Sequence, residues 1–404
     1  MGQSLPESQP LLKPFDTLGL QVSPGYKREV ARLYSSNIEN DITPATQPHR
    51  ANQTNHTKDK VRIGFSSHDF GNHPSTFLFE GIARAHRADS LVDVAAYSYG
   101  ADDGSQARKN IAARLGDPAD GGTFFDIAAM SHDDAVRTVC DHGPDVIFDM
   151  QGYTLGTRPQ LMAARCAGVQ ASFLAFPGTS GASYLDYVVV DRHVSAVERA
   201  EEEFTEKLAV LPRPYQANYF AEPAEIPVRG SNEWKEMRAN EGLSPSAFVF
   251  ANFNKQDKID PASFSSMMRC LRRVPDSVLW LLAPSLPAAA DVVKKNLLRG
   301  AAEAGIAPAR LVFADKVGRA EHLRRMAAGD LFLDTFWYGA HTTATDALRG
   351  GMALLTLAGD SFARRVGTSL LHGMNANRAP ALVTYSVQEF EDVAVEVATA
   401  QRDK

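Results

Sequence analysis

Short apolar runs alternate with amphipathic stretches along most of the chain. From Val61 onward the runs are VRIGFSS, VDVAAYSY, DVIFD, VQASFLAF and DYVVVD, with stretches such as TFLFEGIARAHR and DDAVRTVCDH between them. Strands that alternate with helices of this length are typical of βαβ units and a mostly parallel sheet. The pattern therefore predicts an α/β domain over residues 61–214.

A second alternation follows a polar stretch. Its apolar runs are FVFANFN, SVLWLLA, RLVFAD, DLFLDT, ALLTLAG and ALVTYS, and they predict a second α/β domain over residues 245–404. Residues 215–244 are then a linker. Residues 1–60, rich in Pro, Ser, Asn and Thr around one helical stretch, form a lead-in segment that we expect to be partly disordered. The predicted architecture is two Rossmann-like domains that face a cleft.

Composition narrows the class of protein. The net charge of −6 and pI of about 6.0 argue against a nucleic-acid partner. Cys140, Cys166 and Cys270 have no CxxC spacing, so we expect small core residues and neither a disulfide framework nor a zinc site. No apolar run approaches the roughly 18 residues of a membrane span, and the N-terminus does not resemble a signal peptide. We expect no membrane partner and a cytoplasmic or nuclear location.

Polar residues follow many of the predicted strands. In parallel sheets, ligands bind beyond the carboxyl ends of the strands. Six segments at such ends carry Gly, His, Lys, Thr or Asp: 68–74, 150–154, 177–183, 255–261, 316–325 and 341–351. Together they predict a polar cleft.

The chemistry of these loops favours a phosphate-bearing ligand. There is no GxGxxG after a strand, no P-loop, no HExxH and no convincing DxD at a strand end. Lys258 lies in a strand-to-helix turn, before Asp260 and Pro261 as N-cap and first helical residue. Thr342 and Thr343 open a helix, whose free N–H groups and dipole suit a diphosphate. Such donors can stabilise a leaving diphosphate without a metal, and Asp346 can accept the hydroxyls of a ribose.

Each of these residues also has a structural interpretation. Lys258 can be a solvated turn residue, Thr342 and Thr343 helix caps, and His73 a turn histidine. These alternatives remain open from the residues alone.

Longer segments resemble a known family. RIGFSSHDFGNHPSTFL, PGTSGASYLDYVVVD, ANFNKQDKID, RLVFADKVGRAEHLRR and DLFLDTFWYGAHTTATDALRGG are similar to the catalytic region of O-linked N-acetylglucosamine transferases. The resemblance is to bacterial-type members without the intervening domain of animal enzymes, and it covers residues 12–404. It implies a GT-B fold and an inverting, metal-independent glycosyltransferase. Such an enzyme moves GlcNAc from UDP-GlcNAc to Ser or Thr hydroxyls of a protein or peptide acceptor.

The resemblance also implies roles for individual residues. His73 corresponds to an active-site histidine that serves as the catalytic base or positions the substrates. Lys258 and His341 correspond to catalytic residues at the diphosphate and sugar. The remaining residues correspond to donor and sugar contacts: Thr342 and Thr343 for the diphosphate and sugar, Asp346 for the ribose, His322, Arg325 and Arg319 for the uridine, and Thr154, Gly178 and Gly181 near the sugar.

The sequence departs from the family pattern in places. Lys255 stands where animal enzymes have glutamine, Tyr338 where they have a small cysteine, and Arg319 where a lysine is common. Two other functions remain open: transfer of fucose from GDP-fucose to proteins, and a non-catalytic relative that binds nucleotide sugars. His341 and Asp346 favour UDP-GlcNAc, because the fucosyltransferase group tends to lack that histidine and to carry glutamate in place of the aspartate.

Overall fold

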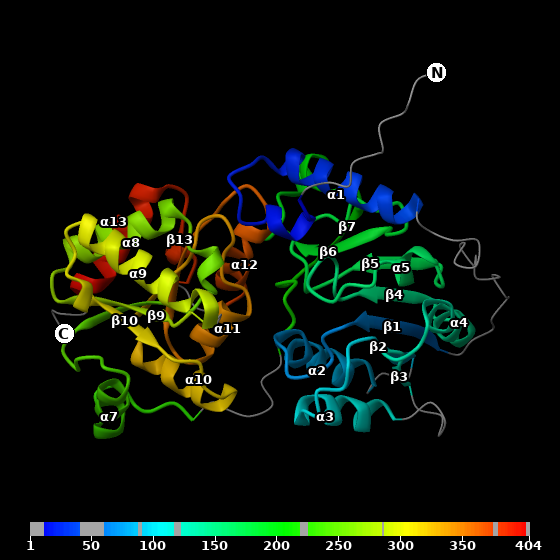
Figure 1. Ribbon diagram of the computed structural model, residues 1–404, viewed down its shortest axis with the longest axis horizontal. Coiled ribbons are helices and arrows are strands. Elements are labelled where there is room, and N and C mark those ends of the chain that lie inside the picture. Colours follow the sequence, from blue (N-terminus) through cyan, green and yellow to red (C-terminus); the bar gives the residue numbers. More distant parts are fainter. Residues whose placement is uncertain are drawn as a thin grey trace, which may run out of the picture. The chain divides into compact units, whose positions relative to one another are not determined.

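The chain forms two compact α/β units, Met1–Phe220 and Ala221–Lys404. In this computed structural model, the described residues are 12–40, 60–87, 91–116, 123–218, 225–284, 287–374 and 379–400. Each unit contains one parallel β-sheet with helices on both faces, as Figure 1 shows. The expected fold class of two Rossmann-like α/β domains is therefore confirmed.

The sheet of the first unit has the strand order β3-β2-β1-β4-β5-β6-β7. Its strands are β1 (Val61–Ser67), β2 (Val92–Ser98), β3 (Phe124–Asp126), β4 (Val146–Asp149), β5 (Val169–Ser172), β6 (Tyr187–Asp191) and β7 (Lys207–Leu211). Its helices are α1 (Pro24–Asn40), α2 (Pro74–Arg87), α3 (Gln106–Leu115), α4 (His132–His142), α5 (Gln160–Ala163) and α6 (Ala200–Glu203). Strand order reverses between β1 and β4, which pair in parallel with Ser66 opposite Asp149. Ligands of doubly wound sheets bind at such a switch point.

The sheet of the second unit has the order β10-β9-β8-β11-β12-β13. Its strands are β8 (Phe248–Asn252), β9 (Ser277–Leu282), β10 (Leu311–Ala314), β11 (Leu331–Leu333), β12 (Ala353–Leu357) and β13 (Val383–Thr384). Its helices are α7 (Asn232–Asn240), α8 (Pro261–Arg273), α9 (Pro287–Glu303), α10 (Arg319–Arg325), α11 (Thr342–Arg349), α12 (Val366–Gly373) and α13 (Val387–Ala400). The order reverses between β8 and β11, so the loops after these two strands leave the sheet side by side.

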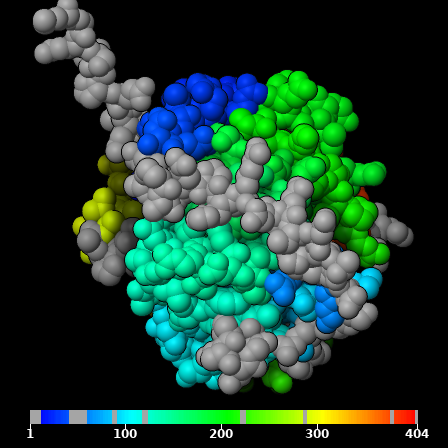
Figure 2. All heavy atoms as spheres, turned by 90° about the vertical axis from the view of Figure 1, so that its right-hand side faces the viewer, coloured from blue at the N-terminus to red at the C-terminus, as the bar shows by residue number. Residues whose placement is uncertain are grey.

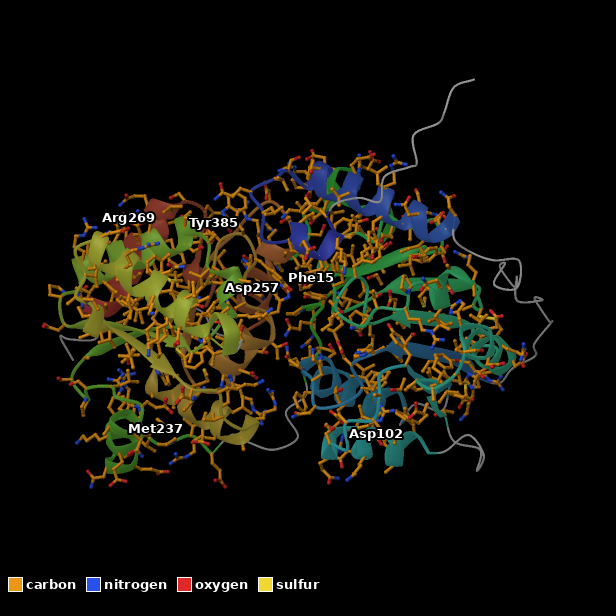
Figure 3. All side chains as sticks on the ribbon, in the orientation of Figure 1. Phe15, Asp102, Met237, Asp257, Arg269 and Tyr385 are labelled. Carbon is orange, nitrogen blue, oxygen red and sulfur yellow. A yellow bond between two sulfur atoms is a disulfide. The ribbon has the colours of Figure 1, made fainter. Side chains whose placement is uncertain are left out.

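Helices on both faces explain the apolar character of the central strands. Every residue of β8 and of β11 is buried, as expected for parallel strands that are covered on both sides. In Figure 1, α8, α9 and α13 lie on one face of this sheet, and α10 and α11 on the other. Arg269 of α8, labelled in Figure 3, donates to Glu391 of α13 at 2.8 Å and fixes these two helices together.

Every predicted apolar run contains a strand, but β3 and β7 are additional. The helical stretch expected in the lead-in segment is present as α1, but its packing on the first unit was not predicted. The described residues of this segment, 12–40, fold onto the first unit, with α1 packed against α5 and α6. In Figure 2 the blue atoms of this helix adjoin the green atoms of the same unit. Residues 1–11 and 41–59 lie outside the described part.

The predicted linker, residues 215–244, is also partly folded. Within it, α7 packs on the second unit, where Trp234 Nε1 donates to the carbonyl of Ala327 at 2.8 Å. Arg238 of α7 is buried and donates to Asp330 at 2.7 Å. Residues 225–244 therefore belong to the second unit, and residues 215–218 belong to the first.

The expectation of no disulfide is wrong. Cys140 on α4 and Cys166 after α5 are bonded, with their Cα atoms 4.6 Å apart. The two cysteines are 26 residues apart, so only the packing of α4 on α5 brings them together. Cys270 is a buried free thiol, as expected. In the described ranges, no helix is long and apolar enough to cross a membrane, and no group of three or more His, Cys, Asp or Glu side chains can hold a metal ion.

Candidate functional site

Lys258 lies in the turn between β8 and α8. The predicted cap is present: Asp260 accepts from the N–H groups of Ala262 and Ser263 at the start of α8. Lys258 Nζ donates to the carbonyl of Gly339 at 2.9 Å and lies 3.6 Å from the ring centroid of Tyr338. Burial lowers the Lys258 pKa to about 8, although the nearby carboxylates oppose this change. The lysine is thus a partly desolvated cation that is held by the loop after β11.

His341 ends that loop and immediately precedes α11. Its Nε2 lies 3.4 Å from the carbonyl oxygen of Ala363, and its ring meets Tyr338 edge-on at 5.2 Å. Burial, and then the positive charge of Lys258, keep the pKa of His341 well below its usual value. His341 is therefore a neutral imidazole at neutral pH.

Thr342 and Thr343 form the first turn of α11. Thr343 Oγ1 donates to Asn254 Oδ1 at 2.7 Å, which ties the helix to the end of β8. No side chain caps the helix at the His341 position. The first N–H groups of a helix have no carbonyl partner inside it, so they and the Thr342 hydroxyl can serve an anion. The Thr343 hydroxyl can do so only in exchange for its bond to Asn254.

Asp346 lies one turn further along α11 and is 6% exposed. Both of its carboxylate oxygens accept from Arg319 of α10, at 3.0 and 3.2 Å. His322 Nε2 lies 3.8 Å from the same carboxylate. Burial lowers the pKa of His322 to about 4 even though the negative charge of Asp346 opposes it. These three predicted contacts of the nucleoside therefore form one cluster.

Arg325 joins this cluster from the end of α10. The side chain is 3% exposed and donates to the carbonyl of Asp315 at 2.7 Å. Its guanidinium lies 5.2 Å from the ring centroid of Phe253, whose edge also meets His322. Arg325 thus helps to form one wall of the cluster.

In the first unit, the loop after β1 brings two histidines to one carboxylate. Asp69 lies 3.0 Å from His68 Nδ1 and 3.4 Å from His73 Nδ1. The N–H of Ser75 donates to His73 Nδ1 at 3.3 Å. Burial lowers the His73 pKa, and the charge of Asp69 opposes this effect. The His73 side chain is nevertheless 46% exposed, so a substrate can reach it.

Gln151, buried after β4, connects this loop to Thr154. Its Nε2 donates to Asp69 at 2.9 Å and to Thr154 Oγ1 at 2.6 Å. Its Oε1 accepts from Ser67 Oγ and from the N–H of His68. Sequence reasoning placed Asp69 and Gln151 in loops at strand ends without giving them a role. Their position after β1 and β4, the two strands at which the strand order reverses, is the feature that could have identified them.

Gly178 and Gly181 lie in the connection between β5 and β6. Gly181 has φ +68°, and a side chain there would overlap the backbone of Ala31 in α1. Its carbonyl accepts from Ser35 Oγ at 2.6 Å. At Gly178 an added Cβ would lie in ordinary contact with Leu18. Packing against α1 is therefore a structural reason for glycine at position 181, and the predicted sugar contact of both residues stays a prediction.

Comparison with known proteins identifies the family. The model of glycosyl transferase family 41 matches residues 11–222 and 231–404. The chain belongs to glycosyl transferase family 41. It is 32% identical over 401 residues to the probable UDP-N-acetylglucosamine–peptide N-acetylglucosaminyltransferase SEC of Arabidopsis thaliana. The matched region covers 96% of this chain and 39% of that protein. It is 26% identical over 445 residues to the corresponding enzyme of Caenorhabditis elegans, covering 84% of this chain and 37% of that protein. The chain thus spans less than half the length of these relatives.

Solved structures agree with the fold. A mutant of the Thermobaculum terrenum O-GlcNAc transferase superposes with a TM-score of 0.80 at 24% identity, over 96% of this chain and 69% of that one. The two parallel-sheet units of this family 41 member are similar to GT-B glycosyltransferases, as the resemblance implied. The roles of the individual site residues stay predictions.

Proposed function

We propose that this family 41 chain transfers N-acetylglucosamine from UDP-N-acetylglucosamine to Ser or Thr hydroxyls of a protein or peptide. The family and the printed activity of its relatives support this proposal. The observation that carries it lies in the second unit. Lys258 and the start of α11 leave the sheet from its two central strands, and the loop that leads into α11 binds Lys258 directly.

In the proposed reaction, the acceptor oxygen forms a bond to the anomeric carbon from the face opposite the diphosphate. The bond between that carbon and the diphosphate oxygen breaks, and UDP leaves with the electron pair. The acceptor gives up its proton. Negative charge grows on the diphosphate during this step, so donors that are fixed in advance lower the barrier. Lys258 and the first turn of α11, with Thr342 and Thr343, supply such donors without a metal ion.

The cluster around Asp346 fits the nucleoside part of the donor. Its carboxylate keeps lone pairs for the two ribose hydroxyls, because each oxygen has more than one acceptor position and Arg319 uses one on each. The neutral His322 and the cation Arg325 offer a flat ring and a flat guanidinium beside it. Both are suitable partners for the uracil.

His73 is the proposed partner of the acceptor hydroxyl. Its lowered pKa makes it neutral at pH 7. In the tautomer with the proton on Nδ1, toward Asp69, its Nε2 can accept a proton, and Asp69 stabilises the imidazolium that results. A role in positioning the substrates is the alternative. Thr154, which is bound to Asp69 through Gln151, lies in the same network.

The test is transfer by the purified chain. We expect a Ser- or Thr-containing peptide to gain the mass of one N-acetylhexosamine from UDP-GlcNAc, with release of UDP. Transfer from GDP-fucose alone would favour the fucosyltransferase alternative. Tight UDP-GlcNAc binding without turnover on any peptide or protein would favour the non-catalytic alternative, and binding of neither nucleotide would reject the proposal.

A further inference from the structure

Asp334, the residue after β11, is the centre of a hydrogen-bonded loop. The residue is 1% exposed. Oδ1 accepts from the N–H groups of Thr335 and Ala340, at 2.8 and 2.6 Å, and Oδ2 accepts from Thr356 Oγ1 at 2.8 Å. The residues from 335 to 340 therefore fold back onto the carboxylate that precedes them.

This loop carries the partners of Lys258. Tyr338 lies under its ammonium group, and Gly339 provides the carbonyl that accepts from it. The packing around Asp334 is tight: a Cβ at Gly339 would lie 3.1 Å from Asp334 Oδ2, and one at Gly367 would lie 3.0 Å from it. The carboxylate and the loop thus hold each other in one arrangement.

Asp334 also supplies charge. The titratable and charged groups that act on Lys258 are Asp334, Asp257, Lys255, His341 and Tyr338. Asp257, labelled in Figure 3, is 56% exposed and paired with Lys255 at 2.8 Å. Its effect on Lys258 is therefore weakened by solvent and by its partner. Asp334 is buried, so its charge is screened much less, and it is the largest of the effects that oppose the desolvation of Lys258.

We propose that Asp334 is a positioning residue of the donor site. It holds the Thr335–His341 loop against Lys258, and it provides the buried negative charge that keeps Lys258 an ammonium ion before a diphosphate binds. The role of Lys258 toward the diphosphate rests on the proposed function. The effect of Asp334 on Lys258 does not, and it can be measured on the protein alone.

The variant Asp334→Asn tests the effect of the Asp334 charge while the side chain keeps nearly the same shape. The amide oxygen of asparagine can still accept from Thr335 and Ala340, and its NH2 group can donate to Thr356 Oγ1. The charge is lost, and the direction of the bond to Thr356 is reversed. Thr356→Val is the matched control, because it removes one bond to Asp334 and leaves the carboxylate charged.

The first measurement is the pH dependence of amine labelling at Lys258, followed by mass spectrometry from pH 6 to 10. Labelling requires the neutral amine, so its midpoint reports the charge of Lys258. We expect a midpoint near 8 for the wild type and about one pH unit lower for Asp334→Asn, at the lower end of what a neighbouring charge produces. Thr356→Val should keep the wild-type midpoint. An unchanged midpoint in Asp334→Asn would overturn the proposal.

The second measurement is the affinity for UDP over the same pH range. We expect affinity to fall as Lys258 loses its proton, and to fall about one pH unit earlier in Asp334→Asn than in the wild type. If the wild type does not bind UDP but the labelling midpoint still moves, the proposed function fails and the inference about Asp334 stands. If the wild type binds UDP but the midpoint of the variant does not move, the inference about Asp334 fails and the proposed function stands.

Gly339→Ala covers the case in which Asp334→Asn does not fold. The added methyl group presses on Asp334 Oδ2 and displaces the loop while every charge stays in place. We expect turnover to fall at least tenfold at every pH, with the Lys258 midpoint moving by much less than one pH unit. Wild-type turnover in a folded Gly339→Ala protein would show that the position of the loop does not matter and would overturn the proposal.

Discussion

Lys258→Met should make the protein more stable and nearly inactive at the same time. Methionine is similar in length and lacks the charge and the donor. In the structure, the Lys258 ammonium is held in a partly desolvated position by one carbonyl, one aromatic ring and the charge of Asp334. In the proposed function, this position prepares the ammonium group for a diphosphate. When no diphosphate is bound, the same position destabilises the folded protein.

The effect on stability follows from the pKa of Lys258. This pKa falls from its usual value of 10.5 to about 8 in the folded protein. At about 1.4 kcal/mol per pKa unit, charged Lys258 destabilises the fold by at most about 3.5 kcal/mol. Between pH 8 and 10.5 the unfolded chain binds more protons than the folded one, so stability rises with pH across this window and the penalty is complete below pH 8.

The net gain is smaller than this limit. Losing the bond to the Gly339 carbonyl costs about 1 kcal/mol, which leaves a gain of up to about 2.5 kcal/mol at pH 7. For a domain of this size, that raises the Tm by up to about 10 °C. Turnover should fall by about 10²–10³-fold, because Lys258 acts on charge that develops in the transition state.

Thermal unfolding at pH 7 and pH 10, together with UDP release in the presence of a peptide acceptor, measures both effects. The difference in Tm between variant and wild type should shrink toward zero or reverse as pH approaches 10.5. Lys295→Met, on the exposed side of α9, is the control and should change neither quantity appreciably. The reasoning is refuted if Lys258→Met is less stable than the wild type at pH 7, or if it keeps more than half of the turnover.

Three further predictions concern other parts of the molecule. Transfer should persist in excess EDTA, since Lys258 and α11 take the place of a cation; loss of activity that magnesium or manganese restores would contradict this. If His73 is the base, kcat/KM should fall at acid pH, because the protonated ring cannot accept a proton. The lowered pKa of His73 places this fall below the usual histidine value of about 6.5. His73→Gln should remove that dependence, and an unchanged profile would leave only a positioning role. Gly181→Ala should destabilise the first unit by more than about 2 kcal/mol, because the methyl group overlaps the backbone of Ala31. The control is Gly104→Ala, at the same φ of +68° in open space, which should cost only about 1 kcal/mol. Equal losses of stability in the two variants would exclude the overlap as the cause.

The sheets could be predicted wherever a strand is buried on both faces. β8 and β11 are buried throughout, and each lies inside an apolar run that the sequence predicts. β3 has only three residues, and β7 is an edge strand with an exposed pattern, so neither produces a long apolar run. The folding of α1 onto the first unit was missed because its apolar residues are few and its contacts are with residues more than 100 positions away.

The same distinction holds for the site. Residue types at strand ends predicted which loops carry chemistry, because all parallel strands present their carboxyl ends at one edge of the sheet. Pairings between loops could not be predicted. The Arg319–Asp346 pair and the Asp69 carboxylate between two histidines depend on where α10, α11 and the loop after β1 pack.

The candidate site of the second unit contains several titratable groups that are buried. The pKa values of Lys258, His322 and His341 are all lowered by burial, and Asp334 is buried with its pKa raised. Burial of these groups destabilises the folded protein when no ligand is bound, so packing of the surrounding core has to offset this cost. In the proposed function, the diphosphate replaces lost solvation with direct hydrogen bonds, so its binding relieves the free-energy penalty on Lys258. This is the physical reason to expect activity and stability to oppose each other at this site, and to expect variants that relieve buried charge to be stable and inactive.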